Sequence, residues 1–242
     1  MEIHVSSLSE WKRPGLATCL VLPAGVGADD ASPLLDKGAH ALVKAARERG
    51  AFTGKAGDST FLPVSSKDVA GILLIGMGDD ANPDAEKVRR AAGKSVESLR
   101  TYRITRLVAD YETRWPLSPF IEGILLGQYR FERYKTPDPD AFTGAIDDVL
   151  LVGEQSDSLN GALDACRRAA RVCANANWAR DLANAASNDM TPAQLAFEAR
   201  TIADTYQFGY ECLDAGRMAE LGMNALLGVA KGSKEPPILI VL

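Results

Sequence analysis

A glycine-rich turn is the first place where this sequence could hold a ligand. Gly76-Met77-Gly78 follows an apolar run and precedes a capped helical pattern, the context in which such turns bind phosphate at a helix N-terminus. The third glycine of the dinucleotide fingerprint is missing, and Asp79-Asp80 would repel an anion. We therefore expect a plain strand-to-helix turn, with nucleotide binding as the alternative.

Paired carboxylates are a second candidate, because acid–base and two-metal chemistry both need converging acids. The pairs Asp29-Asp30, Asp79-Asp80 and Asp147-Asp148 are sequence neighbours in polar stretches. Catalytic carboxylates usually come from different strands and converge on a pocket. Carboxylates that are adjacent in the sequence of a turn are usually solvated or cap a helix. We expect turn and capping roles for all three pairs.

The histidines and cysteines also fall short of a catalytic pattern. His4 and His40 are the two histidines, and neither has a visible nucleophile nearby in the sequence. The cysteine spacing fits neither a zinc site nor a disulfide framework, so we expect reduced thiols, with Cys166 and Cys173 packed on one helix face. The four cysteines are Cys19, Cys166, Cys173 and Cys212.

One stretch is locally basic although the chain as a whole is acidic. Residues 86–106 carry seven basic and two acidic side chains, while the whole chain has a formal net charge of −5. A solvated helix face is the expected reading, and a nucleic-acid or subunit contact is the alternative. The net acidity argues against a general nucleic-acid coat, which needs a positive field.

The composition is that of a soluble globular protein. The chain has 242 residues, of which 46% are hydrophobic and 24% charged, which is enough apolar surface to offset the cost of ordering it. No apolar run approaches the ~20 residues that span a bilayer, and we expect no secretory signal and a cytoplasmic location.

Apolar runs alternate with helical patterns along the chain, which predicts an α/β fold with a mainly parallel sheet. The predicted strands cover residues 17–22, 72–75, 104–108, 149–152 and 238–242, and the last is expected to need a covering layer. Helices are predicted from Ser32-Pro33 to Gly50, from Asn82-Pro83 to Leu99, from Ser118-Pro119 through Phe131, over 158–182, and from Thr191-Pro192 to Gly209.

Four of these helices are expected to bury an apolar stripe at helical spacing. The stripes are Leu35, Ala39, Leu42 and Ala46 in the first, Val88, Ala92, Ser95 or Val96 and Leu99 in the second, Leu159, Leu163, Cys166, Ala170 and Cys173 over 158–182, and Leu195, Ala199, Ile202 and Tyr206 in the last.

Three segments resemble the leucyl (cytosol) aminopeptidases, peptidase family M17, in the order that the family has them. Residues 179–192 read A-R-D-L-A-N-A-A-S-N-D-M-T-P, similar to the family signature A-R-D-L-x-N-x-P-x-N-x-x-T-P. Residues 122–135 read E-G-I-L-L-G-Q-Y-R-F-E-R-Y-K, and residues 221–237 resemble a third family segment. Ala186 is a departure, because the family usually has proline there.

The resemblance implies a fold and a domain order. We expect an N-terminal macro-domain-like α/β sandwich at residues 1–152, a connecting helix at 153–183, and an incomplete start of the catalytic peptidase domain at 184–242. The family implies a hexamer that removes N-terminal residues from peptides with two divalent metals, zinc or manganese, which activate the attacking water.

The family's ligand motifs, G-K-G-x-x-F-D-S-G-G and N-T-D-A-E-G-R, do not occur in the sequence. No catalytic, cofactor-binding or metal residue is therefore assigned, and no metal is expected in this chain. We expect the N-terminal portion of an aminopeptidase, a piece of a longer chain or one completed by a second polypeptide, and inactive alone. The alternatives are an oligomerisation or regulatory module, or a macro-like ligand-binding module that takes ADP-ribose near Gly25-Val26-Gly27 or Gly76-Met77-Gly78.

Overall fold

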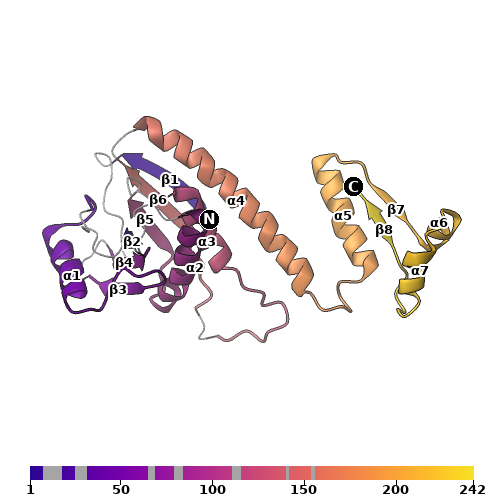
Figure 1. Ribbon diagram of the computed structural model, residues 1–242, viewed down its shortest axis with the longest axis horizontal. Helices are drawn as coiled ribbons and strands as arrows, with labels where there is room; N and C mark the ends of the chain where they lie inside the picture. Colours follow the sequence, from indigo (N-terminus) through magenta and orange to yellow (C-terminus); the bar gives the residue numbers. More distant parts are fainter. Residues whose placement is uncertain are drawn as a thin grey trace. The chain divides into compact units, whose positions relative to one another are not determined.

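The chain folds into two compact units in a computed structural model. Unit 1 is Met1–Asn177 and unit 2 is Trp178–Leu242, and each is described by itself (Figure 1). The structure describes residues 1–7, 18–24, 32–64, 69–78, 84–110, 116–139, 142–153 and 156–242, without the side chains of 18, 22–24, 110 and 156–160. The predicted domain boundaries at 152/153 and 183/184 stay a prediction.

Unit 1 is built on a six-stranded sheet with the order β1-β6-β5-β2-β4-β3. All neighbouring strands are parallel except β3, which pairs antiparallel with β4. The predicted α/β class with a mainly parallel sheet is therefore confirmed. The strands are β1 (Glu2–Ser7), β2 (Thr18–Ala24), β3 (Ser59–Pro63), β4 (Gly71–Gly76), β5 (Arg106–Asp110) and β6 (Asp148–Gly153).

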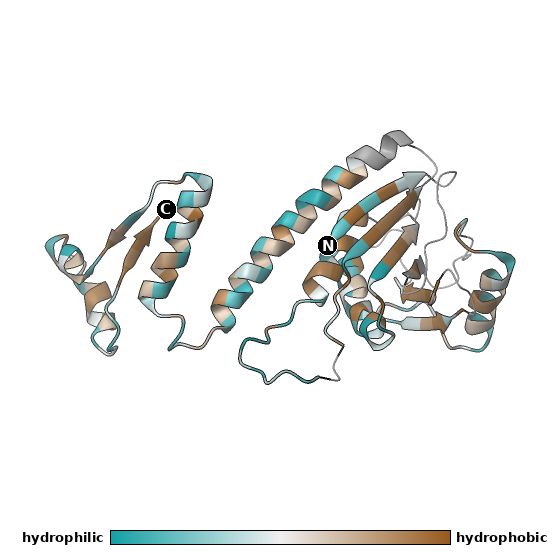
Figure 2. Ribbon diagram, turned by 180° about the vertical axis from the view of Figure 1, so that it is seen from behind, coloured by the Kyte–Doolittle hydropathy of each residue, from teal (hydrophilic) through white to brown (hydrophobic). Residues whose placement is uncertain are grey.

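Alternate residues of the inner strands β2, β4, β5 and β6 face two different cores, as the pleat of a strand requires. Leu73 and Val149 lie in the core under helices α2, α3 and α4, whereas Leu74 and Val108 lie in the core under α1. Burial on both faces explains why these inner strands are short continuous apolar runs, which are largely brown in Figure 2. The helices are α1 (Lys37–Glu48), α2 (Ala85–Thr101), α3 (Leu117–Gly127) and α4 (Ser156–Asn184).

Helix α1 begins later than the sequence predicts. Its N-cap is Asp36, whose side chain accepts a hydrogen bond from Ala39 N at 2.8 Å. Ser32 instead forms a local turn, in which its hydroxyl accepts from Leu34 N at 3.3 Å. The start predicted at Ser32-Pro33 is therefore wrong, because serine and proline serve turns as well as helix starts.

The predicted apolar stripe of α1 is wrong at one position. Leu42 is 42% exposed, whereas its neighbour Val43 is 1% exposed and packs in the core with Phe52. Ala39 and Ala46 are buried as expected. The stripe therefore follows Ala39, Val43 and Ala46, and Leu42 lies to one side of it.

This difference gives a matched pair of substitutions. Val43→Ala should lower the free energy of unfolding by about 2 kcal/mol, because it removes two buried methyl groups and leaves a small cavity. Leu42→Ala removes more carbon but should cost less than about 0.5 kcal/mol, because its side chain is largely solvated. Urea denaturation followed by circular dichroism measures both, and an equal loss would place Leu42 in the core.

Helix α2 buries the stripe that the sequence predicts. Val88, Ala92, Val96 and Leu99 all lie in the core. Its N-cap is Asp84, which accepts from Lys87 N at 2.8 Å, so the cap predicted at Asn82 is wrong. Asn82 and Pro83 themselves lie outside the described residues.

Helices α2 and α3 approach closely through glycines. A Cβ on Gly123 would lie 2.3 Å from Arg89 O, and one on Gly127 would lie 2.7 Å from Gly93 O. The backbones of α2 and α3 therefore touch at these glycines, because no side chain separates them. Helix α3 ends at Gly127, so the extension predicted through Phe131 is wrong; Phe131 lies after the helix, with its ring 5.6 Å from that of Tyr134.

Helix α4 is predicted over residues 158–182 and runs from Ser156 to Asn184. Cys166 and Cys173 are buried as expected. Ala162 and Ala169 complete the buried stripe, and the predicted members Leu163 and Ala170 are half-buried. Among the described residues, no helix is long and apolar enough to cross a membrane.

Unit 2 contains a two-stranded antiparallel sheet and short helices. Thr191 caps α5, and its hydroxyl accepts from Gln194 N at 3.3 Å, which confirms the predicted cap. Glu211 pairs with Val241 across the sheet. The elements are α5 (Pro192–Tyr206), β7 (Glu211–Leu213), α6 (Ala215–Glu220), α7 (Asn224–Ala230) and β8 (Leu239–Val241).

Candidate functional site

The glycine turn at the end of β4 packs against the preceding loop of the chain. A Cβ on Gly76 would lie 2.1 Å from Lys55 O, and Gly78 has φ +84°, a conformation that favours glycine. The amide of Gly76 donates to Asp58 O at 2.7 Å, and that of Gly78 donates to Gly54 O at 2.8 Å. These amides are already used within the protein, which favours the plain turn over a phosphate cradle.

The carboxylate of Asp58 holds the loop that the glycine turn contacts. Its Oδ2 accepts from Thr53 N at 2.9 Å and from Thr53 Oγ1 at 2.5 Å. These hydrogen bonds, with smaller contributions from the charges of Lys55 and Lys94, lower the pKa of Asp58 below its ordinary value. Hydrogen bonds to the charged form account for the direction of the shift.

The lowered pKa predicts a dependence of stability on pH. The ionised Asp58 contributes stability above its unfolded pKa of 3.8, and that contribution is lost as the pH falls through the lower, folded value. Asp58→Ala should therefore cost about 1 kcal/mol at pH 7, allowing for solvent screening, and progressively less at and below pH 3.8. Urea denaturation across this pH range tests it, and a pH-independent difference would contradict it.

The described acidic pair Asp147-Asp148 lies at the start of β6, beside charged residues of both neighbouring strands. Asp148 is in register with Glu2 of β1 and Arg106 of β5. Arg106 Nε lies 3.6 Å from Asp148 Oδ2, and His4 Nε2 lies 3.3 Å from Glu2 Oε2 and 3.7 Å from Asp148 Oδ1.

These contacts are weak as stabilising or catalytic interactions. The side chains of His4 and Arg106 are 55% and 54% exposed, so solvent screens them. Asp147 is exposed, as expected. The turn or capping role expected of Asp148 is wrong, because this residue opens strand β6, and its Oδ1 is buried without a hydrogen-bond partner among the described residues. The pairs Asp29-Asp30 and Asp79-Asp80, and the segment Gly25-Val26-Gly27, lie outside the described residues.

The basic stretch 86–106 is partly neutralised by acidic side chains. Arg89 Nε donates to Glu122 Oε2 of α3 at 2.7 Å, and Arg89 also pairs with Glu86. Arg90 Nε donates to Glu86 Oε1 at 2.8 Å. Hydrogen bonds from Arg90 and Arg89 lower the pKa of Glu86, and the bond to Glu122 raises the pKa of Arg89.

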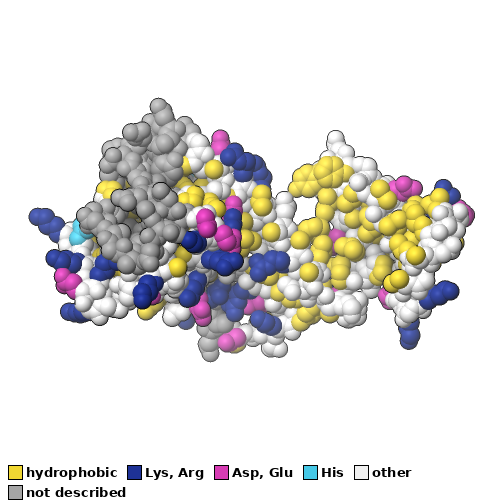
Figure 3. Space-filling view, in the orientation of Figure 1, with side chains coloured by type: hydrophobic (Ala, Val, Ile, Leu, Met, Phe, Trp, Pro, Cys, Tyr) yellow, Lys and Arg dark blue, Asp and Glu magenta, His cyan; other side chains and the backbone are white. Residues whose placement is uncertain are grey.

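These ion pairs favour the expected reading of a helix face over a nucleic-acid surface. In Figure 3, Lys and Arg side chains are interspersed with Asp and Glu on the visible face of unit 1. A surface that attracts phosphates needs an uncompensated positive field. Arg89 serves mainly to join α2 to α3.

The buried cysteines are packing residues. Burial raises the pKa of the Cys166 thiol to about 11, and it also raises the pKa values of Cys19 and Cys173. A raised pKa keeps the thiol protonated, whereas nucleophiles and metal ligands are thiolates. The expectation of core packing for Cys166 and Cys173 is confirmed, and Cys212 is free and exposed.

The described residues do not form a metal centre. Among residues that the structure describes, no group of three or more His, Cys, Asp or Glu side chains could hold a metal ion. Two divalent metals need several converging carboxylate or imidazole ligands. The described part of the chain therefore does not fit such a pair of metals.

Comparisons with known proteins place both halves of the chain in one family. Residues 24–138 match the profile of the cytosol aminopeptidase family, N-terminal domain, and residues 177–242 match that of the catalytic domain. A probable cytosol aminopeptidase of Geobacter sp. (strain M21) is 36% identical over 200 residues, 79% of this chain and 40% of the relative. One of Mycobacterium sp. (strain KMS) is 30% identical over 98% of this chain and 47% of the relative.

Solved structures share the fold of the chain. A mutant tomato leucine aminopeptidase aligns with a TM-score of 0.79 at 23% identity, covering 99% of this chain and 50% of that one. The bottromycin maturation enzyme BotP aligns with a TM-score of 0.67 at 23% identity, over 92% of this chain and 45% of that one. The chain spans about half the length of these relatives or less, and it belongs to the cytosol aminopeptidase family, peptidase family M17.

Proposed function

We propose that this chain is the N-terminal portion of a metal-dependent aminopeptidase, which releases N-terminal amino acids from peptides when its catalytic domain is complete. The observation that carries the proposal is the match, in order, to the N-terminal and catalytic profiles of one family. The relatives at 36% and 30% identity are named probable cytosol aminopeptidases, which supports the same activity in the cytosol.

We further propose that the 242 residues do not hydrolyse peptides by themselves. The motifs G-K-G-x-x-F-D-S-G-G and N-T-D-A-E-G-R, which carry the family's metal ligands, do not occur in the sequence. The described residues also lack a cluster of three possible metal ligands. Two divalent metals, zinc or manganese, belong in this proposal to the complete enzyme; one structural relative, BotP, was solved in complex with Mn.

In this proposal, unit 1 supplies a folded support and the contacts of a homo-oligomer, a hexamer by kinship. It has a buried apolar core on each face of the sheet, and its charges at α2 and α3 are partly paired. These features suit a structural role better than a site for chemistry.

The proposal predicts a null result that a simple assay can check. The purified chain, supplied with Mn²⁺ or Zn²⁺, should show no hydrolysis of leucyl-p-nitroanilide above the rate of metal in buffer. A full-length relative, such as that of Geobacter sp. (strain M21), serves as the active control. Turnover by the 242-residue chain that a chelator abolishes would refute the claim of inactivity.

A further inference from the structure

A long segment of unit 1 joins α3 to β6. It covers residues 128–147, and its described parts, 128–139 and 142–147, form neither helix nor strand. Connections in compact domains usually have about 4–6 residues, and those longer than about 12–15 are often functional. Figures 1 and 2 show this segment running away from the sheet and its helices, and residues 132–139 are exposed throughout. A connection of this length and exposure indicates a role beyond joining two elements.

Both ends of this segment are anchored in unit 1. The side chain of Gln128, at the end of α3, accepts a hydrogen bond from Ile146 N through its Oε1 at 3.0 Å. Ile146 is buried in the core, and Asp147 N donates to Thr105 O at 3.0 Å. The base of the segment is therefore held by contacts that do not depend on the chain between the two anchors.

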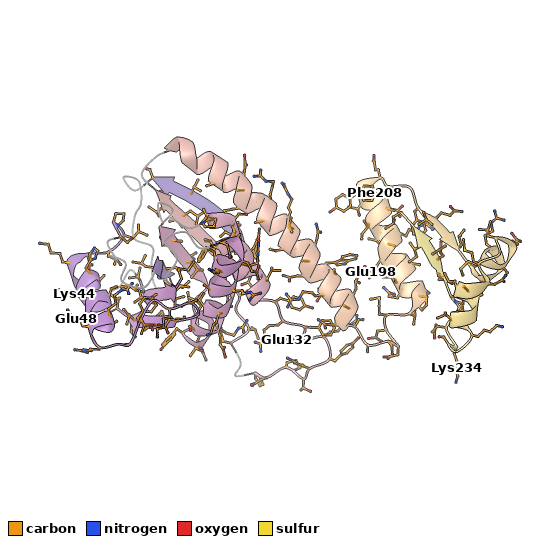
Figure 4. The ribbon with its side chains drawn as sticks, viewed as in Figure 1. Lys44, Glu48, Glu132, Glu198, Phe208 and Lys234 are labelled. Carbon is orange, nitrogen blue, oxygen red and sulfur yellow. The ribbon has the colours of Figure 1, made fainter. Side chains whose placement is uncertain are left out.

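The first half of the segment is held by local contacts. Arg130 Nε lies 3.0 Å from Glu132 Oε1, and the guanidinium of Arg133 lies 5.7 Å from the centre of the Tyr134 ring. Lys135 N donates to Glu132 O at 3.0 Å, which closes a turn. Figure 4 labels Glu132 on this segment, away from the helices and strands. Both arginines are therefore engaged in the contacts of this turn or beside it.

The peptide bond between Lys135 and Thr136 follows directly after this turn. Lys135 is exposed, and its side chain forms no hydrogen bond or ion pair within the described part of the chain. Thr136 likewise forms no hydrogen bond there. A protease binds its substrate as an extended, unpaired stretch of chain, so exposed loops with few backbone hydrogen bonds are the usual places of cleavage. Lys135 is the basic residue of this segment that best meets that requirement.

We propose that residues 132–138 form a cleavage site for a protease that cuts after basic residues, and that the bond hydrolysed is Lys135–Thr136. Water adds across this bond, so Lys135 gains a carboxylate and Thr136 gains a free amino group. No other bond changes, and the protease is the only further reactant. The inference does not rest on the proposed function, because neither the metals nor peptidase activity enters it.

The cut chain stays assembled, because the two fragments share one core. The first fragment keeps β1 to β5, and the second keeps β6, which lies between β1 and β5 in the sheet. Val149 and Leu151 of β6 are each 0% exposed. Cys166 of α4, in the second fragment, packs in the same core as Ile121 and Ile124 of α3, in the first. Cleavage therefore converts unit 1 into two chains held together by buried apolar surface.

A lysine in a helix provides a matched comparison. The side chain of Lys44, in α1, is 77% exposed and lies 3.9 Å from that of Glu48, as labelled in Figure 4. Its backbone is helical, and its neighbours Val43 and Ala46 are buried. A protease can therefore cut after Lys44 only when α1 has unfolded, although the side chain itself is accessible.

Limited digestion of the full chain with trypsin tests the site, with the fragments identified by mass. Without urea, cleavage after Lys135 should be at least about a hundredfold faster than after Lys44, because only the second bond needs prior unfolding. In urea below the unfolding transition, cleavage after Lys44 should accelerate and cleavage after Lys135 should stay nearly constant. Each rate is divided by that of a short peptide substrate under the same conditions. Equal rates, or the same urea dependence at both bonds, would overturn the site.

Two variants and a sizing measurement complete the test. Lys135→Gln should slow cleavage of the whole segment at least about tenfold, whereas Lys44→Gln should be cut like the unsubstituted chain. Undiminished cleavage after Arg130 or Arg133 in Lys135→Gln would overturn the assignment of Lys135. The cut chain should elute from a sizing column as one species and separate into two in denaturant. Two separate peaks in native buffer would contradict the claim that the fragments stay assembled.

Discussion

Gly123→Ala should lower the free energy of unfolding by about 2 kcal/mol, although alanine is the better helix former by about 1 kcal/mol. The added Cβ would lie 2.3 Å from Arg89 O and 2.7 Å from the Cβ of Ala92, both on the neighbouring helix α2. This clash can be relieved only if the backbones of α2 and α3 move apart, which also weakens the packing of the core between them. The steric cost therefore outweighs the gain in helix propensity.

The same substitution in an open position is the matched control. Gly161 lies in α4, and a Cβ there would meet nothing within 4 Å. Gly161→Ala should raise the free energy of unfolding by roughly 0.5–1 kcal/mol through helix propensity alone. Urea denaturation followed by circular dichroism at a helical wavelength measures the free energy of unfolding of both variants. An increase for both would show that α2 and α3 do not pack tightly at Gly123.

Met218→Ala should unfold most of unit 2 while unit 1 stays folded. Met218 is fully buried, and removing a side chain of this size from a core costs about 2–5 kcal/mol. Unit 2 has one other large buried side chain, Leu213, so this loss is comparable to all the stability that so small a unit holds.

Hydrogen exchange resolved by segment measures this effect. In the variant, residues 192–241 should lose protection while strands β4 and β5 keep theirs. Leu226→Ala, at a position 37% exposed on α7, is the control and should change little. Loss of protection in both units together would show that they unfold as one body.

Four of the six strands of unit 1 could be predicted because burial on both faces leaves a continuous apolar run. Strands β1 and β3 were not predicted, and none of their side chains is fully buried. Ile72-Leu73-Leu74-Ile75 and Val149-Leu150-Leu151-Val152 lie in strands that extend no further than one residue beyond each predicted end. The strand predicted at 104–108 lies instead at Arg106–Asp110. Ile104 N bonds back to Leu99 O at 2.9 Å, so this residue closes α2 before the strand begins.

Helix starts were harder to predict because several residues in a row can cap. Asp36 and Asp84 form the observed caps of α1 and α2, although Ser32 and Asn82 precede them and are equally good capping types. The deciding factor is where the buried stripe begins, which depends on the sheet beneath it. The sequence alone does not reveal that placement.

The buried face of helix α5 was also predicted incorrectly in part. Its predicted stripe included Leu195 and Tyr206, which are 42% and 63% exposed, while the small residues Ala196, Ala199 and Ala203 face the core. The spacing of apolar residues predicts a helix here, but it does not predict which of these side chains are buried within the 242 residues.

For the candidate site, the sequence mainly predicted which kinds of chemistry these residues would not perform. The amides of Gly76 and Gly78 bond to the loop at Asp58 and Gly54, which favours the interpretation of Gly76-Met77-Gly78 as a plain turn. The role of Asp58 in holding that loop was missed, since one aspartate in a polar stretch gives no distinctive signal. The Arg89–Glu122 pair was also missed, because its partners lie 33 positions apart in the sequence.

We propose that this chain acts as an aminopeptidase only together with the rest of its catalytic domain, and one rate measurement tests this. Leucyl-p-nitroanilide hydrolysis is compared for the 242-residue chain, for the segment of the Geobacter sp. (strain M21) relative that follows its match to this chain, and for the two co-expressed, each with Mn²⁺. We expect chelator-sensitive turnover in the co-expressed sample and none with either part alone. Equal turnover by the chain alone and by the pair would contradict it.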